Sequence, residues 1–220
     1  MRKWIPLLII AAACIASAAV WSRLPDTMPT HWNLAGEVDG WSGKVFGAWL
    51  MPAIIAGLWF ILRFLPRLDP RRANYAKFGP TYEAIIVTVM LFLFCLHAVA
   101  LRTALGLPAP MERLVPLGAG AMMIVIGNLL PRARPNWFVG IRTPWTLSSD
   151  RVWERTHRVG GRLFVVGGIV VVLAALFAPQ LAQRIMIGTL VAESIAVVAY
   201  SYMEWRHLNS GDPAKPTQAS

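Results

Sequence analysis

Long apolar stretches alternate with short polar, turn-rich segments along most of the chain. Each stretch holds about 20 residues, which as a helix is enough to cross the hydrocarbon core of a bilayer. The pattern therefore predicts an all-α protein, a polytopic membrane bundle of about six transmembrane helices. We expect the spans at residues 4–21, 46–65, 83–101, 114–130, 160–178 and 185–203.

The composition favours the same class, because 56% of the residues are hydrophobic and only 15% are charged, too apolar for an ordinary soluble domain. The net charge of +10 does not call for a nucleic-acid partner, since the basic residues collect in loops on one side of the predicted bundle. All of the 21 lysines and arginines lie on that side except Arg23, Lys44, Arg102, Arg113 and Arg184. The positive-inside rule then predicts that both termini and residues 131–162 are cytoplasmic and that residues 23–45 are external.

Three parts follow from this topology. Residues 1–66 hold two spans and the external loop, which is rich in proline, glycine and tryptophan. Residues 67–206 hold four spans and the cytoplasmic loop 131–162, named here the signature segment. Residues 207–220 form a polar tail that we expect to be disordered.

The external loop contains too many prolines and glycines for a long helix, and Asn33–Gly36 and Asp39-Gly40 are turn signals. Trp32 and Trp41 suit the headgroup layer. His31, Glu37 and Asp39 could hold a divalent cation, but their spacing matches no standard metal motif. The favoured interpretation is that His31 and Asp39 hydrogen-bond to the backbone of the turns, so we predict neither a metal nor a cofactor.

The signature segment divides into two halves. Proline and glycine indicate an ordered loop over residues 136–147, after which Ser148 and Ser149 can cap a helix with Asp150 in its first turn. That helix carries an arginine stripe, formed by Arg151, Arg155, Arg158 and Arg162. The stripe, interleaved with tryptophans, predicts a surface for anionic lipid or for a cytoplasmic protein, and the alternative is a simple orientation signal.

No catalytic motif emerges from the chain. His157 lies near Ser148 and Ser149, but there is no nucleophile elbow, HExxH, P-loop or dinucleotide fingerprint. We therefore expect no enzymatic activity.

Two ionisable residues fall inside predicted spans, where charge is costly and function is the default hypothesis. Glu193 lies near the middle of the sixth span and His97 in the outer part of the third. They would form a proton or ion pathway together, or Glu193 would lock two helices through a hydrogen bond. The sequence leaves both interpretations open.

Two motifs resemble a known family. The external PTHWNLAGEVDGW resembles the short domain of unknown function found near the start of SdpI-like membrane proteins. The segment NWFVGIRTPWTLSSDRVWERTHRVGGR resembles the SdpI signature, especially in GIRTPWTLSS and VWERTHR. The resemblance implies a six-helix protein of the bacterial inner membrane.

The resemblance also implies a function, since the founding member of the family is an immunity protein against a secreted, membrane-active peptide toxin. That protein also acts as a receptor that holds a transcriptional repressor at the membrane. Immunity or signalling is therefore the leading hypothesis, with a small transporter or ion pathway through His97 and Glu193 as the alternative. A lipid-interacting envelope protein without a peptide ligand is the third.

On the leading hypothesis the residues divide between two sites. The external site that would recognise a peptide comprises His31, Trp32, Asn33, Gly36, Asp39 and Trp41. The cytoplasmic site that would contact the repressor or lipid comprises Asn136, Gly140, Arg142, Thr143, Pro144, Trp145, Ser148, Trp153, Thr156, His157 and Arg158.

Overall fold

The computed structural model describes residues 4–210 and consists mainly of long helices. Six helices are long and apolar enough to cross a membrane, which confirms the predicted bundle: α1 (Ile5–Val20), α2 (Lys44–Phe64), α3 (Tyr75–Ala104), α4 (Met111–Leu129), α6 (Asp150–Phe177) and α7 (Pro179–Ser210). A short helix, α5 (Pro144–Ser148), precedes α6. Strands β1 (Thr27–Trp32) and β2 (Val38–Gly43) form an antiparallel hairpin between α1 and α2. Single 3₁₀ turns follow α1, α2 and α4 and precede α3.

Two helix boundaries differ from the sequence prediction. The arginine-bearing helix and the fifth span are one continuous helix, α6: no proline separates them, and Gly160 and Gly161 at the junction are buried within the helix. The last helix continues to Ser210, so the predicted disordered tail begins too early at residue 207. The rest of that tail, residues 211–220, lies outside the described residues.

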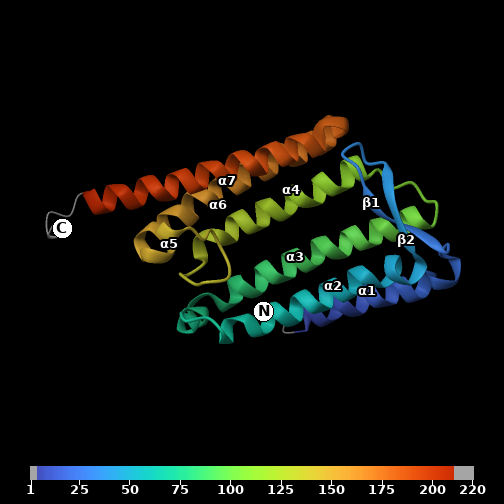
Figure 1. Ribbon diagram of the computed structural model, residues 1–220, viewed down its shortest axis with the longest axis horizontal. Coiled ribbons are helices and arrows are strands. Elements are labelled where there is room, and N and C mark those ends of the chain that lie inside the picture. The colour runs from blue at the N-terminus through green and yellow to red at the C-terminus, as the bar shows by residue number, and fades with distance from the viewer. Residues whose placement is uncertain (1–3, 211–220) are drawn as a thin grey trace, which may run out of the picture.

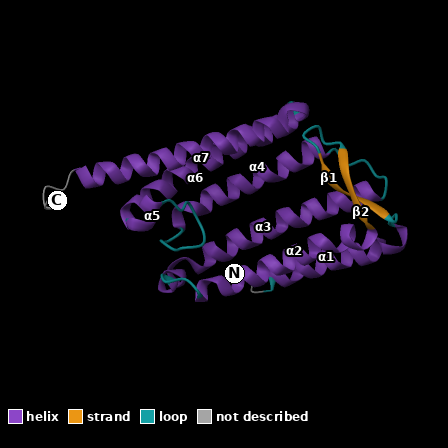
Figure 2. Ribbon diagram, in the orientation of Figure 1, coloured by secondary structure: helices purple, strands orange, loops and turns teal. Residues whose placement is uncertain are grey.

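The helices run side by side, and the hairpin and the signature segment lie at opposite ends of the bundle (Figure 1). Helices α1, α2 and α3 pack together, α4, α6 and α7 pack together, and α3 against α4 joins the two groups. Figure 2 shows the hairpin across one end of an otherwise helical molecule. We name that end the hairpin end and the opposite one, with the signature segment and the C-terminal end of α7, the signature end.

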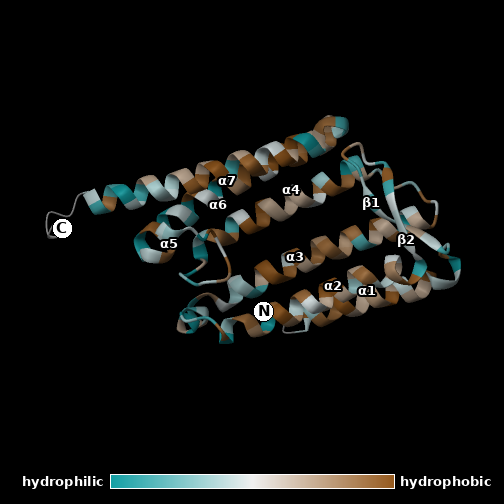
Figure 3. Ribbon diagram, in the orientation of Figure 1, coloured by the Kyte–Doolittle hydropathy of each residue, from teal (hydrophilic) through white to brown (hydrophobic). Residues whose placement is uncertain are grey.

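The outer surface of the bundle is apolar over its middle and more polar toward its ends (Figure 3). Helix α6 illustrates the rule, because it buries small residues such as Gly161, Gly168 and Ala175 while Val166, Ile169 and Leu173 point outward. Small residues inside and large apolar residues outside are typical of helices in lipid, where apolar side chains gain nothing from avoiding their surroundings. The chain is thus a multi-pass membrane protein.

The closest helix contact lies between α4 and α6. A Cβ atom on Gly127 would lie 2.6 Å from the carbonyl oxygen of Gly161, and one on Gly120 would lie 2.8 Å from that of Gly168. Real Cβ atoms do not approach so closely, so both pairs must be glycine for the two backbones to meet. This contact fixes α4 against α6 and holds the signature segment between them.

Candidate functional site

The loop predicted to be external folds into a hairpin, which the sequence did not lead us to expect. Its turn was predicted, and the structure confirms it: the Asn33 side-chain oxygen accepts hydrogen bonds from the backbone N–H groups of Ala35 and Glu37, and Gly36 has a φ of +81°. The strands were not predicted because they contain proline and several glycines, which are rare in sheets. An isolated two-stranded hairpin is marginal in water, so its order must come from contacts with the helices.

Those contacts span the hairpin end of the bundle. Met28 is fully buried in a cluster with Leu24, Ala48 and Leu101. At the far end of the hairpin, a Cβ on Gly36 would lie 2.8 Å from the backbone nitrogen of Glu112, in the first turn of α4. The hairpin therefore crosses from the α1–α2 connection to α4 and bridges both groups of helices.

His31 and Asp39 lie on the exposed face of the hairpin and pair with each other through Nδ1 and Oδ1. The prediction that they would bind the backbone of the turns was wrong, because strand pairing brings the two side chains together across the hairpin. No group of three or more histidine, cysteine or acidic side chains able to hold a metal ion occurs among residues 4–210.

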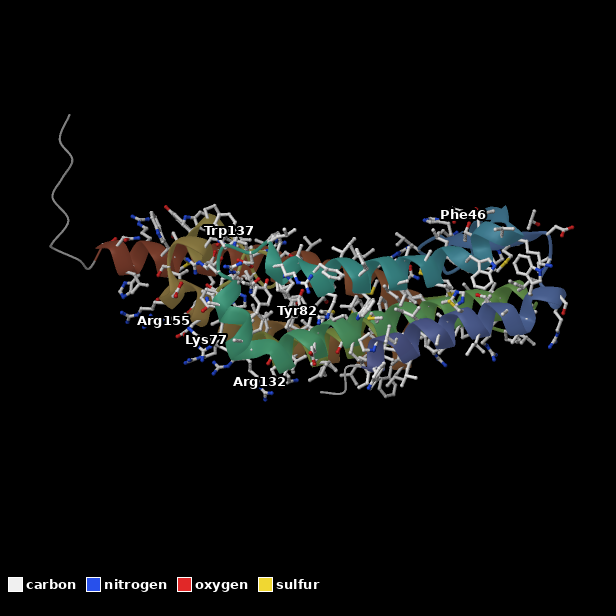
Figure 4. The ribbon with its side chains drawn as sticks, turned by 90° about the horizontal axis from the view of Figure 1, so that it is seen from below. Phe46, Lys77, Tyr82, Arg132, Trp137 and Arg155 are labelled. Atoms are coloured by element: carbon white, nitrogen blue, oxygen red, sulfur yellow. The ribbon has the colours of Figure 1, made fainter. Side chains whose placement is uncertain are left out.

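Large apolar side chains remain exposed around the hairpin. Trp32 is half-buried, but the exposed set, named here the hairpin rim, consists of Leu34, Trp41, Val45 and Phe46. Figure 4 shows Phe46 at this end, far from Trp137 at the signature end. The rim is an apolar surface next to the lipid-facing helices.

At the signature end, Asn136 is completely buried rather than available to a partner. Its amide oxygen accepts hydrogen bonds from the backbone N–H groups of Phe138 and Val139 and, at 3.3 Å, from the Tyr75 hydroxyl. Its amide nitrogen donates to the carbonyl groups of Arg134 and Val139. This one side chain thus satisfies four polar backbone groups of the loop in which it lies.

A second buried residue, Asp69, ties the signature segment to the α2–α3 connection. Its carboxylate accepts hydrogen bonds from the Tyr75 hydroxyl, from the Trp137 backbone N–H at 2.9 Å and from the Arg71 backbone N–H at 2.7 Å. The Arg71 guanidinium donates to the Asp150 carboxylate at the start of α6. Sequence reasoning missed these residues; the one available signal was a lone aspartate in an otherwise basic loop.

His157 has a structural role that its hydrogen bonds define. Nδ1 lies 2.8 Å from the Trp153 carbonyl oxygen, so it donates, and Nε2 accepts from the Ile141 backbone N–H at 3.0 Å. One donating and one accepting nitrogen describe a neutral imidazole. Gly140, with a φ of +117°, lies against this ring, and a Cβ there would be 2.4 Å from Nε2. The buried Trp153 indole stacks on the same ring and donates to the Ala133 carbonyl.

The predicted loop over residues 136–147 contains the start of α5, which was not foreseen. Thr143 and Thr146 form a capping box at its N-terminus, and the Thr143 hydroxyl also lies 3.1 Å from that of Ser201 on α7. Ser149 caps α6 and Asp150 occupies its first turn, as predicted. Ser148 instead ends α5 and donates to the Trp145 carbonyl.

The residues of the predicted cytoplasmic site therefore separate into two groups. The buried ones hold the fold together: Asn136, Thr143, Trp153, Thr156 and His157. The exposed ones form a surface, together with the partly buried Trp145, whose ring packs on Tyr202: Arg142, Pro144, Ser148 and Arg158. Within the arginine stripe, Arg155 is only half-exposed and pairs with Glu204 on α7. Figure 4 shows Arg155, Lys77 and Arg132 at this same end.

The two intramembrane residues do not pair with each other. Ser17 on α1 donates to the Ala48 carbonyl, and His97 Nε2 lies 2.9 Å from the Ser17 oxygen. Glu193 on α7 instead packs on Gly167 of α6, where a Cβ would overlap its Oε1. Each residue thus joins a different pair of helices, one in each group, and the predicted His97–Glu193 partnership was wrong.

Comparison with known proteins gives two regional matches and one relative of similar length. Residues 132–203 match the SdpI/YfhL protein family, and residues 8–56 match the domain of unknown function DUF1648. The chain is 22% identical to the immunity protein SdpI of Bacillus subtilis (strain 168) over 208 residues, which cover 94% of this chain and 98% of that protein. No solved structure matches. The resemblance inferred from the two motifs is confirmed: the chain is similar to SdpI over nearly its whole length, and a DUF1648 region precedes a region similar to the SdpI/YfhL family.

Proposed function

We propose that this protein gives its cell immunity to a membrane-active peptide toxin; its Bacillus relative is named an immunity protein. The observation that carries the proposal is the similarity to the immunity protein SdpI over 94% of the chain. Because the match includes both the hairpin and the signature segment, the whole architecture is available for the function.

Recognition would take place at the hairpin rim. Trp41 and Phe46 are 61% and 53% exposed and lie beside helices that face lipid. Apolar side chains at that level meet a peptide that lies in the outer leaflet, and the exposed His31–Asp39 pair adds polar contacts to its edge. Hydrophobic contact with an amphipathic peptide is the binding mode that such a surface favours.

A signal would travel from the hairpin to the signature end through α4. The hairpin turn lies against the first turn of α4, and the glycine pairs fix α4 against α6. A peptide that prefers one position of the hairpin would bias this helix pair, because a ligand shifts an equilibrium only by its differential affinity for the two states. The exposed Arg142, Pro144, Ser148 and Arg158 would then present altered contacts to a cytoplasmic repressor.

Survival of a sensitive bacterial strain tests immunity. Cells that produce the protein, or carry the empty vector, are challenged with the peptide toxin that the founding SdpI immunity protein neutralises. Protection is expected, and it should be lost when His31, Trp32 and Asp39 are replaced together by alanine. No protection by a correctly inserted wild-type protein would contradict the proposal.

A second candidate function, an ion pathway, rests on Glu193. Its Oε2 atom is buried and has no hydrogen-bond partner within residues 4–210, and an unsatisfied intramembrane carboxylate is a default functional candidate. Glu193→Gln separates the two functions, since glutamine keeps the shape but cannot ionise. Immunity should survive this change. If immunity were lost while the amount of folded protein stayed normal, the ion pathway would be favoured.

A further inference from the structure

A pocket at the signature end, separate from the exposed signature surface, lies among α1, α2 and α3. Its volume is about 360 Å³, within the range of roughly 300–1,000 Å³ that small-molecule sites occupy. The apolar part of its wall comes from residues such as Trp59, Ile86 and Val87. Tyr82 closes the gap between α3 and α2, where its hydroxyl donates to the Leu62 carbonyl (Figure 4).

Two charged side chains line the pocket, one from α2 and one from α3. Arg63 lies in the last turn of α2 and lines the pocket, and its side chain forms no ion pair with any residue from 4 to 210. Glu83 also lines the pocket. A guanidinium group at the water–lipid boundary favours a phosphate group, which it can bind through two parallel hydrogen bonds. The polar part of a ligand should therefore carry phosphate.

The length of the pocket indicates what the apolar part of the ligand is. On α3 the lining residues run from Tyr75 to Val87, which is about 18 Å at 1.5 Å per residue. This is a little more than half of the ~30 Å hydrocarbon core. Beyond Arg63 and Glu83 the wall is apolar, formed by Trp59, Ile86 and Val87, and it suits the first part of one acyl chain of one leaflet.

We propose that this pocket binds a glycerophospholipid from the leaflet at the signature end, with its phosphate against Arg63 and one acyl chain along Trp59, Ile86 and Val87. The lipid contacts Tyr75, whose hydroxyl donates to Asp69 and Asn136. It therefore supports the hydrogen-bond network that connects the α2–α3 connection to the signature segment. The lipid site involves no peptide, so lipid binding can be tested separately from immunity.

The chain offers matched variants for this site. Gly79 lines the pocket, and a Cβ there would meet no atom within 4 Å, so Gly79→Leu fills the pocket without a clash. Val87→Trp fills its deeper part, and Arg63→Ala removes the cation. Gly57 on α2 is equally open but lies outside the pocket, which makes Gly57→Leu the control for volume. Arg132→Ala removes an exposed arginine of the same end that does not line the pocket.

Native mass spectrometry of the full chain tests the proposal, after incubation with phosphatidylglycerol, phosphatidylethanolamine or, as a non-phosphate amphiphile, palmitate. The wild type, Gly57→Leu and Arg132→Ala should retain one phospholipid when weakly held lipids have been stripped. Gly79→Leu and Val87→Trp should lower its affinity about tenfold, equivalent to about 1.4 kcal/mol, and Arg63→Ala should lower it several-fold for both phospholipids. Equal retention by all variants, or palmitate bound as tightly as phospholipid, would overturn the proposal.

Discussion

The hairpin end and the signature end both carry family motifs, yet they are held in opposite ways. The hairpin docks mainly through two buried residues, Met28 and Pro29, and through close backbone contacts, and its aromatic rim stays exposed. The signature segment is fixed by buried Asn136, Asp69 and His157, each with several hydrogen bonds. A fully satisfied buried network specifies one structure, whereas a lightly held apolar surface can adapt to a ligand. We infer that recognition belongs to the first end and rigidity to the second.

The largest effect should come from separating α4 and α6, on which the signature end depends. Gly161→Leu places a side chain where even a Cβ lies 2.5 Å from the Gly127 carbonyl oxygen, so we expect little or no folded protein. The control Gly57→Leu adds the same side chain where no atom lies within 4 Å and should fold normally. The amount of monodisperse protein after gel filtration in mild detergent measures both; equal yields would show that the contact is not essential.

The second-largest effect on stability should come from loss of the buried Asn136 amide in the signature segment. Asn136→Ala leaves the backbone groups of Phe138, Val139 and Arg134 without their partner and should lower the free energy of unfolding by about 2–4 kcal/mol. Thermal unfolding in detergent measures the change. Arg158→Ala, at an exposed site of the same segment, should stay within about 0.5 kcal/mol. Similar effects of both changes would contradict the division into buried framework and exposed surface.

At the hairpin end, removal of a buried side chain should destabilise the hairpin but not the whole bundle. Met28→Ala removes a completely buried side chain, which costs about 2–5 kcal/mol in a well-packed core. Met28 packs on Ala48 and Leu101 near the ends of α2 and α3, but these helices also contact each other along their length. We therefore expect faster proteolysis within residues 27–43 while the helices remain resistant. If the whole bundle lost stability together, the hairpin would be part of the framework rather than a separately held surface.

The smallest effect should come from the ion pair between α6 and α7. Arg155 is 40% exposed and Glu204 is 10% exposed, so solvent screens part of their attraction. Arg155→Ala should lower stability by about 1 kcal/mol or less, and the difference should shrink in high salt. A salt-independent loss as large as that of Asn136→Ala would place Arg155 in the framework.

The sequence was informative where its signals were long and periodic. Six apolar stretches, the cap at Ser149 and the turn at Asn33–Gly36 are local features, and each appears in the structure. The hairpin strands could not be recognised, because Pro29, Gly40 and Gly43 resemble loop residues and the strands depend on contacts made by Met28.

Long-range partnerships were equally hidden from the sequence. Asp69 and Asn136 meet through Tyr75 although the two lie in different loops, and nothing local to either residue specifies that contact. His97 was one candidate partner for Glu193, because both are ionisable within predicted spans, and the sequence left this open. Their packing on Ser17 and Gly167 depends instead on which helices are neighbours. The motif residues therefore indicated the family resemblance but not which side chains are buried.

The most direct test places the same photo-crosslinking amino acid at position 41 or at position 137. The tryptophans there are 61% and 49% exposed and lie at opposite ends of the bundle, so they form a matched pair. With labelled peptide toxin added to intact cells, we predict an adduct at position 41 and none at position 137. An adduct at position 137 alone, or at both positions equally, would contradict recognition by the hairpin end.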